Sequence, residues 1–200
     1  MNISLRLHLG IILLSLVMLN ACSSVPKTTE IWMDEAYVGS RVNKVLVIGV
    51  AEKITFQTLF EGKFADQLEK KGLEAVPSYT VMQPNQSLSK ATVLPLVEKL
   101  GIDTVIVTSL IDRKEKTVFY QVNSGNLYNY YNGMQSTYVK SGKTASYKVP
   151  ILVLRTNLYD VNTEKLVWSI TSESEFSYKM DSIDSAIEFL IKSLAKDSLI

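Results

Sequence analysis

Residues 42–50 read VNKVLVIGV. The residues that follow them have apolar side chains at helical spacing, and this pattern ends at Gly72. The apolar run at 45–48, three of whose four residues are β-branched, is typical of a strand that is buried on both faces of a sheet. Apolar side chains then recur at helical spacing before Gly72, on Phe56, Leu59, Phe60, Phe64 and Leu68. The stretch 42–72 therefore predicts a buried strand followed by an amphipathic helix over residues 56–71.

The same alternation continues along the chain. Residues 73–82 and 103–111 predict two further strands, and residues 89–100 between them have helical spacing that ends at Gly101. Pro77 places the first of these strands at an edge or a break of the sheet, because proline lacks a backbone donor. An order of strand, helix, strand, helix, strand is typical of α/β proteins.

The second half of the chain adds strands and one helix. Residues 117–122 extend the third strand or start a hairpin, and residues 149–160 and 166–176 predict two strands joined by a short turn. A last helix is predicted from the apolar spacing of Ile183, Ala186, Ile187, Leu190, Ile191 and Leu194. We therefore expect an α/β (α+β) fold with a single mixed sheet and about three packed helices, in the order β-α-β-α-β-β-β-α. A loop rich in Tyr, Asn and Gly is expected as an insertion at residues 123–147.

The N-terminus has the features of a targeting segment. Residues 9–19 read LGIILLSLVML, a run too short to cross a bilayer as a helix, which takes about 20 residues. The run has the length of the apolar region of a signal peptide, and Leu19-Asn20-Ala21-Cys22 follows it directly. These four residues resemble the bacterial lipobox. The resemblance implies cleavage before Cys22, diacylglycerol on its sulfur and an acyl chain such as palmitate on its new amine.

The alternatives for this segment are a plain secretory signal or a short anchor with an unmodified cysteine. On the lipoprotein interpretation, residues 1–21 are a signal peptide, residues 22–30 a lipidated tether and residues 31–200 a single periplasmic domain. Ser23 follows the cysteine, and by resemblance to Gram-negative sorting a residue other than Asp favours the outer membrane. We therefore expect the lipid to anchor the protein to the outer membrane, with its domain facing the periplasm.

The residue inventory limits the chemistry of the processed chain. The sequence has one cysteine, Cys22, and one histidine, His8, so cleavage and acylation leave neither a histidine nor a free thiol. Disulfides, zinc sites with Cys or His ligands, and Ser–His or Cys–His nucleophiles are thereby excluded. A net charge of +1 gives no basic excess for binding nucleic acid. We expect no catalytic residue, no metal, no cofactor and no nucleic-acid partner.

Two pairs of carboxylates keep an enzymatic alternative open. Glu173 and Glu175 lie on one face of a predicted strand, and a glycosidase needs two carboxylates about 5–10 Å apart across a cleft. A solvated strand face is the other interpretation. Asp181 and Asp184 stand near the start of the last helix, where they would complement its dipole.

The segment 120–147 has an unusual composition. It contains six of the ten tyrosines together with Asn, Ser and Gly, and it has no acidic residue. This is the composition of adaptable recognition loops, in which rigid rings supply contact area. The candidate binding residues are Tyr128, Tyr130, Tyr131 and Tyr138. In the alternative, the tyrosines pack on the parent domain and have only a structural role.

Six short segments carry a resemblance to a known group of proteins. They are residues 32–37 (WMDEAY), 44–50 (KVLVIGV), 59–61 (LFE), 75–79 (AVPSY), 157–161 (NLYDV) and 166–169 (LVWS). Together they resemble a family of uncharacterised bacterial envelope lipoproteins. The order of elements is also similar to the periplasmic α/β domains of curli-secretion-channel lipoproteins and of the TolB N-terminal domain. The resemblance implies this fold and an envelope location, and it transfers no catalytic residue.

These observations lead to one expected function and two alternatives. We expect a lipid-anchored envelope lipoprotein that acts as a non-enzymatic binding or scaffold module, with an envelope protein or glycan as partner. The first alternative is an accessory subunit of an envelope secretion or assembly complex. The second is an enzyme that uses carboxylates on envelope glycan.

Overall fold

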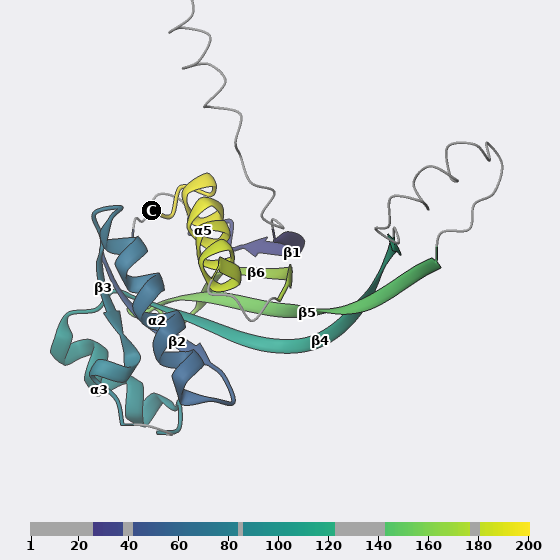
Figure 1. Ribbon diagram of the computed structural model, residues 1–200. Helices are drawn as coiled ribbons and strands as arrows, with labels where there is room; N and C mark the ends of the chain where they lie inside the picture. The colour runs from purple at the N-terminus through teal and green to yellow at the C-terminus, as the bar shows by residue number, and fades with distance from the viewer. Residues whose placement is uncertain (1–25, 38–41, 84–85, 123–142, 177–180) are drawn as a thin grey trace, which may run out of the picture.

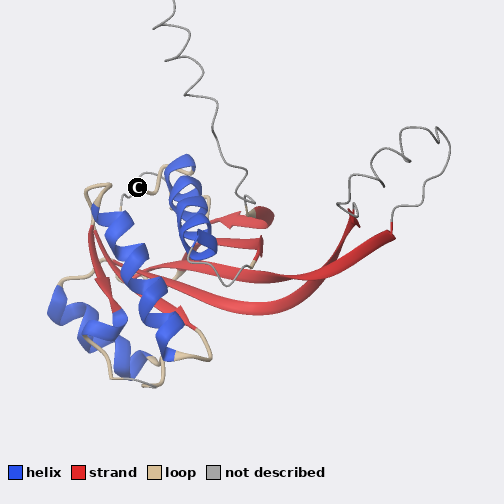
Figure 2. Ribbon diagram, viewed as in Figure 1, coloured by secondary structure: helices blue, strands red, loops and turns tan. Residues whose placement is uncertain are grey.

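The computed structural model describes residues 26–37, 42–83, 86–122, 143–176 and 181–200. These residues form one six-stranded mixed sheet with helices packed on it (Figures 1 and 2). The strands are β1 (Lys27–Met33), β2 (Lys44–Val50), β3 (Glu74–Pro77), β4 (Thr104–Val122), β5 (Lys143–Asp160) and β6 (Leu166–Glu175). The helices are α2 (Ile54–Glu69), α3 (Lys90–Leu100) and α5 (Asp181–Lys196), with a short 3-10 turn, η1 (Ser78–Thr80), after β3.

The strand order across the sheet is β1-β6-β5-β4-β2-β3. β2 runs parallel to β3 and to β4, whereas the other paired strands are antiparallel. Helix α2 connects β2 to β3 and helix α3 connects β3 to β4, so two strand–helix–strand units build the parallel part. The predicted α/β (α+β) class with a single mixed sheet is confirmed.

Each face of the sheet carries its own hydrophobic core. Helices α2 and α5 cover one face, where Phe64 and Val47 are fully buried. Helix α3 covers the other face, where Val97 packs with Leu46. Strand β2 contributes alternate side chains to both cores, which is why its sequence is a continuous apolar run and not an alternating one.

The predicted ends of the elements are formed as the sequence indicates. Helix α3 begins after Ser89, whose backbone N–H donates to Thr92 Oγ1 at 3.0 Å. It ends at Gly101, whose φ of 64° is left-handed and favours glycine. Strand β3 lies at the edge of the sheet and ends at Pro77, as the missing proline donor predicts.

Two boundaries differ from the sequence-based expectation. Strand β1 begins at Lys27, so residues 27–30 of the expected tether pair with β6 at the edge of the sheet. All seven residues of β1 are exposed, and a strand without a buried face has no apolar pattern to reveal it. Strand β5 begins at Lys143, so residues 143–147 of the expected loop insertion also belong to a strand.

Strands β4 and β5 extend well beyond the rest of the sheet (Figures 1 and 2). They remain paired from Thr104 opposite Asp160 to Val122 opposite Lys143. Strand β6 accompanies β5 only as far as Ile151, which lies opposite Glu175. Among the described residues, no other strand pairs with residues 115–122 and 143–150. We call this projecting two-stranded ribbon the hairpin arm.

The last helix supplies a direct test of the core. Leu190 is 1% exposed in the core under α5, whereas Lys192 on the same helix points to solvent and pairs with Glu188 at 2.6 Å. We expect Leu190→Ala to lower the free energy of unfolding by about 2–5 kcal/mol, because it removes buried apolar contacts and leaves a cavity. Lys192→Ala should change it by less than about 0.5 kcal/mol. Thermal denaturation compares the two, and equal small effects would contradict the packing of α5.

Candidate functional site

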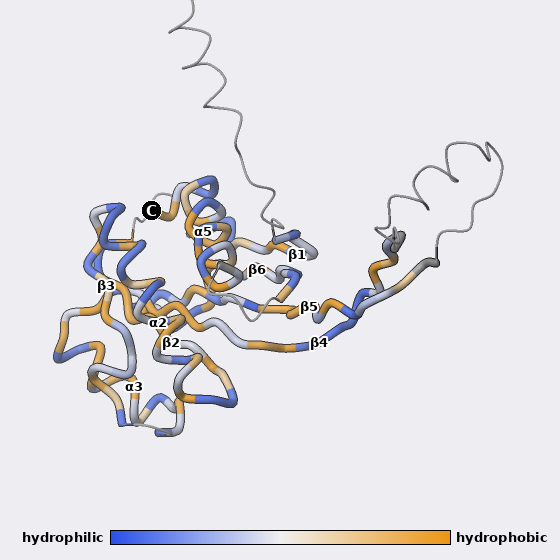
Figure 3. Tube along the Cα trace, viewed as in Figure 1, coloured by the Kyte–Doolittle hydropathy of each residue, from blue (hydrophilic) through white to orange (hydrophobic). Residues whose placement is uncertain are grey.

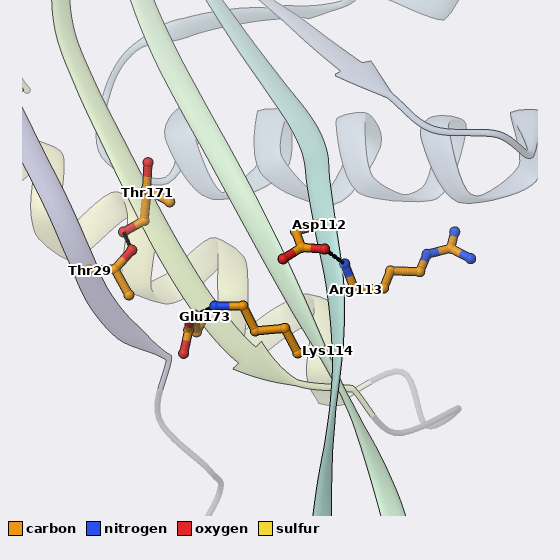
Figure 4. A network of polar contacts seen from close by, with 6 residues as sticks. All are labelled: Thr29, Asp112, Arg113, Lys114, Thr171 and Glu173. Atoms are coloured by element: carbon orange, nitrogen blue, oxygen red, sulfur yellow. Dashed lines mark hydrogen bonds and ion pairs between the residues drawn. The ribbon is translucent and has the colours of Figure 1, made fainter.

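The root of the hairpin arm is a zone of ion pairs on both faces of the ribbon. Lys114 and Lys116 of β4 reach across β5 to Glu173 and Glu175 of β6, with Nζ to Oε1 distances of 2.6 and 2.7 Å. Figure 4 shows the first of these pairs from close by. Hydrogen bonding to the carboxylate, and its charge, raise the pKa of each lysine, so both ammonium groups stay charged at neutral pH.

The other face of the arm carries a matching pair. Lys148 Nζ donates to Glu115 Oε2 at 2.5 Å, and this contact raises the pKa of Lys148 in the same way.

A bulge between Leu110 and Asp112 precedes the arm. At the bulge, the Arg113 backbone N–H donates to Asp112 Oδ1 at 2.8 Å (Figure 4). Bulges change the direction of a strand, and this one lies between Ser109, the last residue of β4 that pairs with β2, and the start of the arm.

Along β4, Figure 3 shows a hydrophilic stretch followed by a more hydrophobic one. In the sequence, the charged run 112–116 is followed by the aromatic residues Phe119 and Tyr120. Phe119 is 69% exposed, Tyr147 54% and Tyr120 49%. The rings of Tyr120 and Tyr147 lie 5.9 Å apart between centroids, because these residues sit diagonally across the ladder on one face. Successive side chains of a strand point to opposite faces, so Phe119 lies on the other face. The outer part of the arm therefore presents aromatic side chains on both faces.

A mostly apolar groove lies at the root of the arm. It has a volume of about 340 Å³ and is lined by Phe56 and Phe60 of α2, Leu152 and Leu154 of β5, and Ile183 of α5. Arg113 and Glu52, which form an ion pair of 3.2 Å, also line it. The groove is at the carboxyl end of β2, the position where α/β sheets place ligands.

One carboxylate is fully buried. Glu61 of α2 has 0% exposure and accepts four hydrogen bonds. The donors are Gly49 N at 2.8 Å, Gln57 Nε2 at 3.0 Å, Ser78 Oγ at 2.7 Å and Tyr79 N at 3.0 Å. The carboxylate thus joins α2 to the carboxyl end of β2 and to the turn after β3. All its partners are neutral donors, so the arrangement fixes a position in the fold and offers no open face to a substrate.

The residues singled out from the sequence fall into two groups. Cys22 and the candidate binding residues Tyr128, Tyr130, Tyr131 and Tyr138 lie outside the described residues.

The structure describes the acidic candidates Glu173, Glu175 and Asp184, and it places Asp181 as the first residue of α5. Glu173 and Glu175 each bind a lysine across the sheet and do not face each other across a cleft. Asp184 pairs with Lys63 of α2 at 2.5 Å. Within the described ranges, no group of three or more His, Cys, Asp or Glu side chains could hold a metal ion. Nor does any helix in those ranges have the length and apolarity to cross a bilayer.

The sequence reasoning missed Phe119 and Glu61. Phe119 lies in the predicted strand or hairpin at residues 117–122, just before the tyrosine-rich segment, and was not among the candidate binding residues. Glu61 stands three residues before Phe64 and seven before Leu68, so it shares the buried stripe of α2. An acidic residue in the line of a buried helical stripe was the signal that could have found it.

Comparison with known proteins gives similarity of shape only. No family model and no curated protein matches the chain. Among solved structures, the PelC dodecamer from Paraburkholderia phytofirmans is 14% identical, with 86% of this chain and 97% of that chain covered at a TM-score of 0.48. Lipoprotein GNA1162 from Neisseria meningitidis is 13% identical over 77% of this chain and 99% of that one, with a TM-score of 0.45. The hypothetical protein CT253 from Chlamydia trachomatis is 10% identical over 78% and 97%, with a TM-score of 0.36.

Proposed function

We propose that this protein is a lipid-tethered, non-enzymatic binding module of the bacterial envelope, and that the hairpin arm is its binding surface. The observation that carries the proposal is the arm itself, a ribbon that projects from the sheet and exposes Phe119, Tyr120 and Tyr147. The lipid tether is expected from the segment that ends in Cys22.

The contribution of the arm to folding does not explain its aromatic side chains. An isolated two-stranded ribbon is only marginally stable in water, and aromatic side chains that stay exposed add little burial to it. Large exposed aromatic residues cost solubility, and they are the residues that most often carry binding energy at interfaces. A surface that binds a partner explains why the arm keeps exposed aromatic side chains although they lower solubility.

The described acidic side chains support binding over catalysis. Glu173 and Glu175 are each engaged by a lysine, and Glu61 is enclosed by four donors. A glycosidase needs a protonated acid and a free carboxylate on opposite sides of an open cleft. Charged carboxylates held by ammonium groups on an open strand face are the arrangement of a solvated surface.

The arm can be tested in intact cells. A photoreactive phenylalanine analogue in place of Phe119 should form a discrete adduct with an envelope component. The matched control puts the same analogue in place of Lys99, an exposed residue near the end of α3. An adduct yield several-fold higher at position 119 supports the proposal, and equal yields at the two positions would contradict it.

A variant separates binding from folding. We expect the triple variant Phe119→Ser, Tyr120→Ser, Tyr147→Ser to change the free energy of unfolding by only about 1 kcal/mol, because the three side chains are exposed. With the analogue placed at Val118 instead, the same substitutions should abolish the adduct. A large drop in melting temperature would show that the aromatic residues hold the fold, and would contradict the proposal.

A further inference from the structure

The geometry points to the partner of the hairpin arm: its aromatic end seats in the headgroup region of the bilayer that carries the protein's own lipid. This inference rests on the proposed function, since it requires a lipid on Cys22 and an arm that binds. It adds that the domain is attached to the membrane at two points, the acylated terminus and the arm. Three features of the chain support it.

The first feature is that the chain enters the sheet at the end from which the arm leaves. Strand β1 is antiparallel to β6 and places Lys27 opposite Glu173. Glu173 and Glu175 are at the end of β6, and Glu175 lies opposite Ile151, where the arm begins. The start of β1 and the root of the arm are therefore at the same end of the sheet, as Figure 1 shows.

The second feature is the relation between two lengths. Pro26, the residue before β1, is four positions after Cys22, and four extended residues span at most about 14 Å. The arm runs eight residues past Lys114, the residue opposite Ile151, which is about 27 Å at the usual rise of a strand. The tether is about half as long as the arm. An acylated terminus therefore keeps this end of the sheet close enough to the bilayer for the arm to reach its surface.

The third feature is the distribution of side chains along and around the arm. Ion pairs stand at the root on both faces, and exposed aromatic rings stand farther out on both faces. A rigid protein surface contacts one face of a ribbon, whereas a lipid headgroup region surrounds both. Tyrosine rings prefer that region, because the ring is apolar and the hydroxyl remains hydrated.

The test uses the full acylated protein in vesicles of phosphatidylethanolamine and phosphatidylglycerol at three to one. Cys22 is the single cysteine, so one introduced cysteine can carry a nitroxide label without a competing free thiol. Labels are placed with Phe119→Cys and Tyr147→Cys on the two faces of the arm, and with Lys99→Cys as the control on α3. Electron paramagnetic resonance then compares access of apolar oxygen and of a polar nickel chelate to each label.

We expect oxygen access to exceed chelate access at positions 119 and 147 once vesicles are present, and no such change at position 99. Shielding of only one of the two arm positions, or dipolar broadening between labels of neighbouring copies, would overturn the inference in favour of a protein partner. A protein that floats with the vesicles while both arm labels stay as open to the chelate as position 99 would overturn this inference and leave the proposed function standing. Failure to float with the vesicles would overturn both.

Discussion

Replacing Glu61 with alanine should lower the free energy of unfolding by about 2–5 kcal/mol, the largest loss that we expect from a single substitution outside the apolar core, because two buried backbone donors lose their acceptor. The side chain is fully buried and accepts hydrogen bonds from two backbone N–H groups, those of Gly49 and Tyr79. Alanine would leave both backbone donors without their acceptor inside the protein. It would also release Ser78 and Gln57, whose side chains donate to the same carboxylate.

The conservative variant Glu61→Gln tests the reason for this loss. Glutamine keeps the shape but offers one acceptor oxygen and one NH₂ group, so at least one of the present donors would face another donor. We expect an intermediate loss of about 1–3 kcal/mol. The matched control is Glu69→Ala at the exposed end of α2, which should be close to neutral. Urea denaturation of the purified protein measures all three, and a Glu61→Ala effect as small as the control would contradict the role of Glu61.

Helices and buried strands could be predicted because their buried apolar residues follow a recognisable pattern in the sequence. Helix α5 buries Ile187, Leu190 and Leu194 at helical spacing, and that spacing is visible without any structure. Strand β2 was equally visible, because apolar residues on both faces give a continuous run. These elements form the two cores and account for the confirmed fold class.

Strand β1 and the full length of β4 could not be predicted in the same way. Strand β1 is exposed along its length, and it is specified by the free edge of β6 and not by its own pattern. Strand β4 continues through the charged run at 112–116, because its ladder to β5 satisfies the backbone while the side chains pair across strands. Both elements depend on partners that are far away in sequence.

The candidate site also has a part that local sequence can indicate and a part that depends on tertiary contacts. The composition of residues 120–147 predicts an aromatic binding region, and this stays a prediction because its candidate residues Tyr128, Tyr130, Tyr131 and Tyr138 lie outside the described residues. Tyr120 and Tyr147, at the two ends of that segment, are exposed. The role of Glu61 was not predicted, because its donors come from β2 and from the turn after β3, which only the tertiary fold brings together.

Changing Cys22 to serine should remove the protein's stable hold on the membrane. A serine cannot receive the thioether-linked diacylglycerol, so the domain is released into the periplasm or the precursor stays uncleaved. Each buried CH₂ contributes about 0.8 kcal/mol to membrane binding, so the acyl chains together outweigh the three exposed aromatic side chains of the arm by a wide margin. The arm alone is therefore expected to give only weak association with the membrane.

Fractionation of cells that express the wild-type and the Cys22→Ser proteins measures this effect, and mass spectrometry of the N-terminal peptide identifies its cause. The wild-type peptide should begin at residue 22 and carry the added mass of the acyl groups. The control is Ser24→Ala, two residues farther on, which should leave processing and membrane attachment unchanged. A wild-type N-terminal peptide with an unmodified cysteine would contradict the prediction, and with it the short tether on which the orientation of the arm depends.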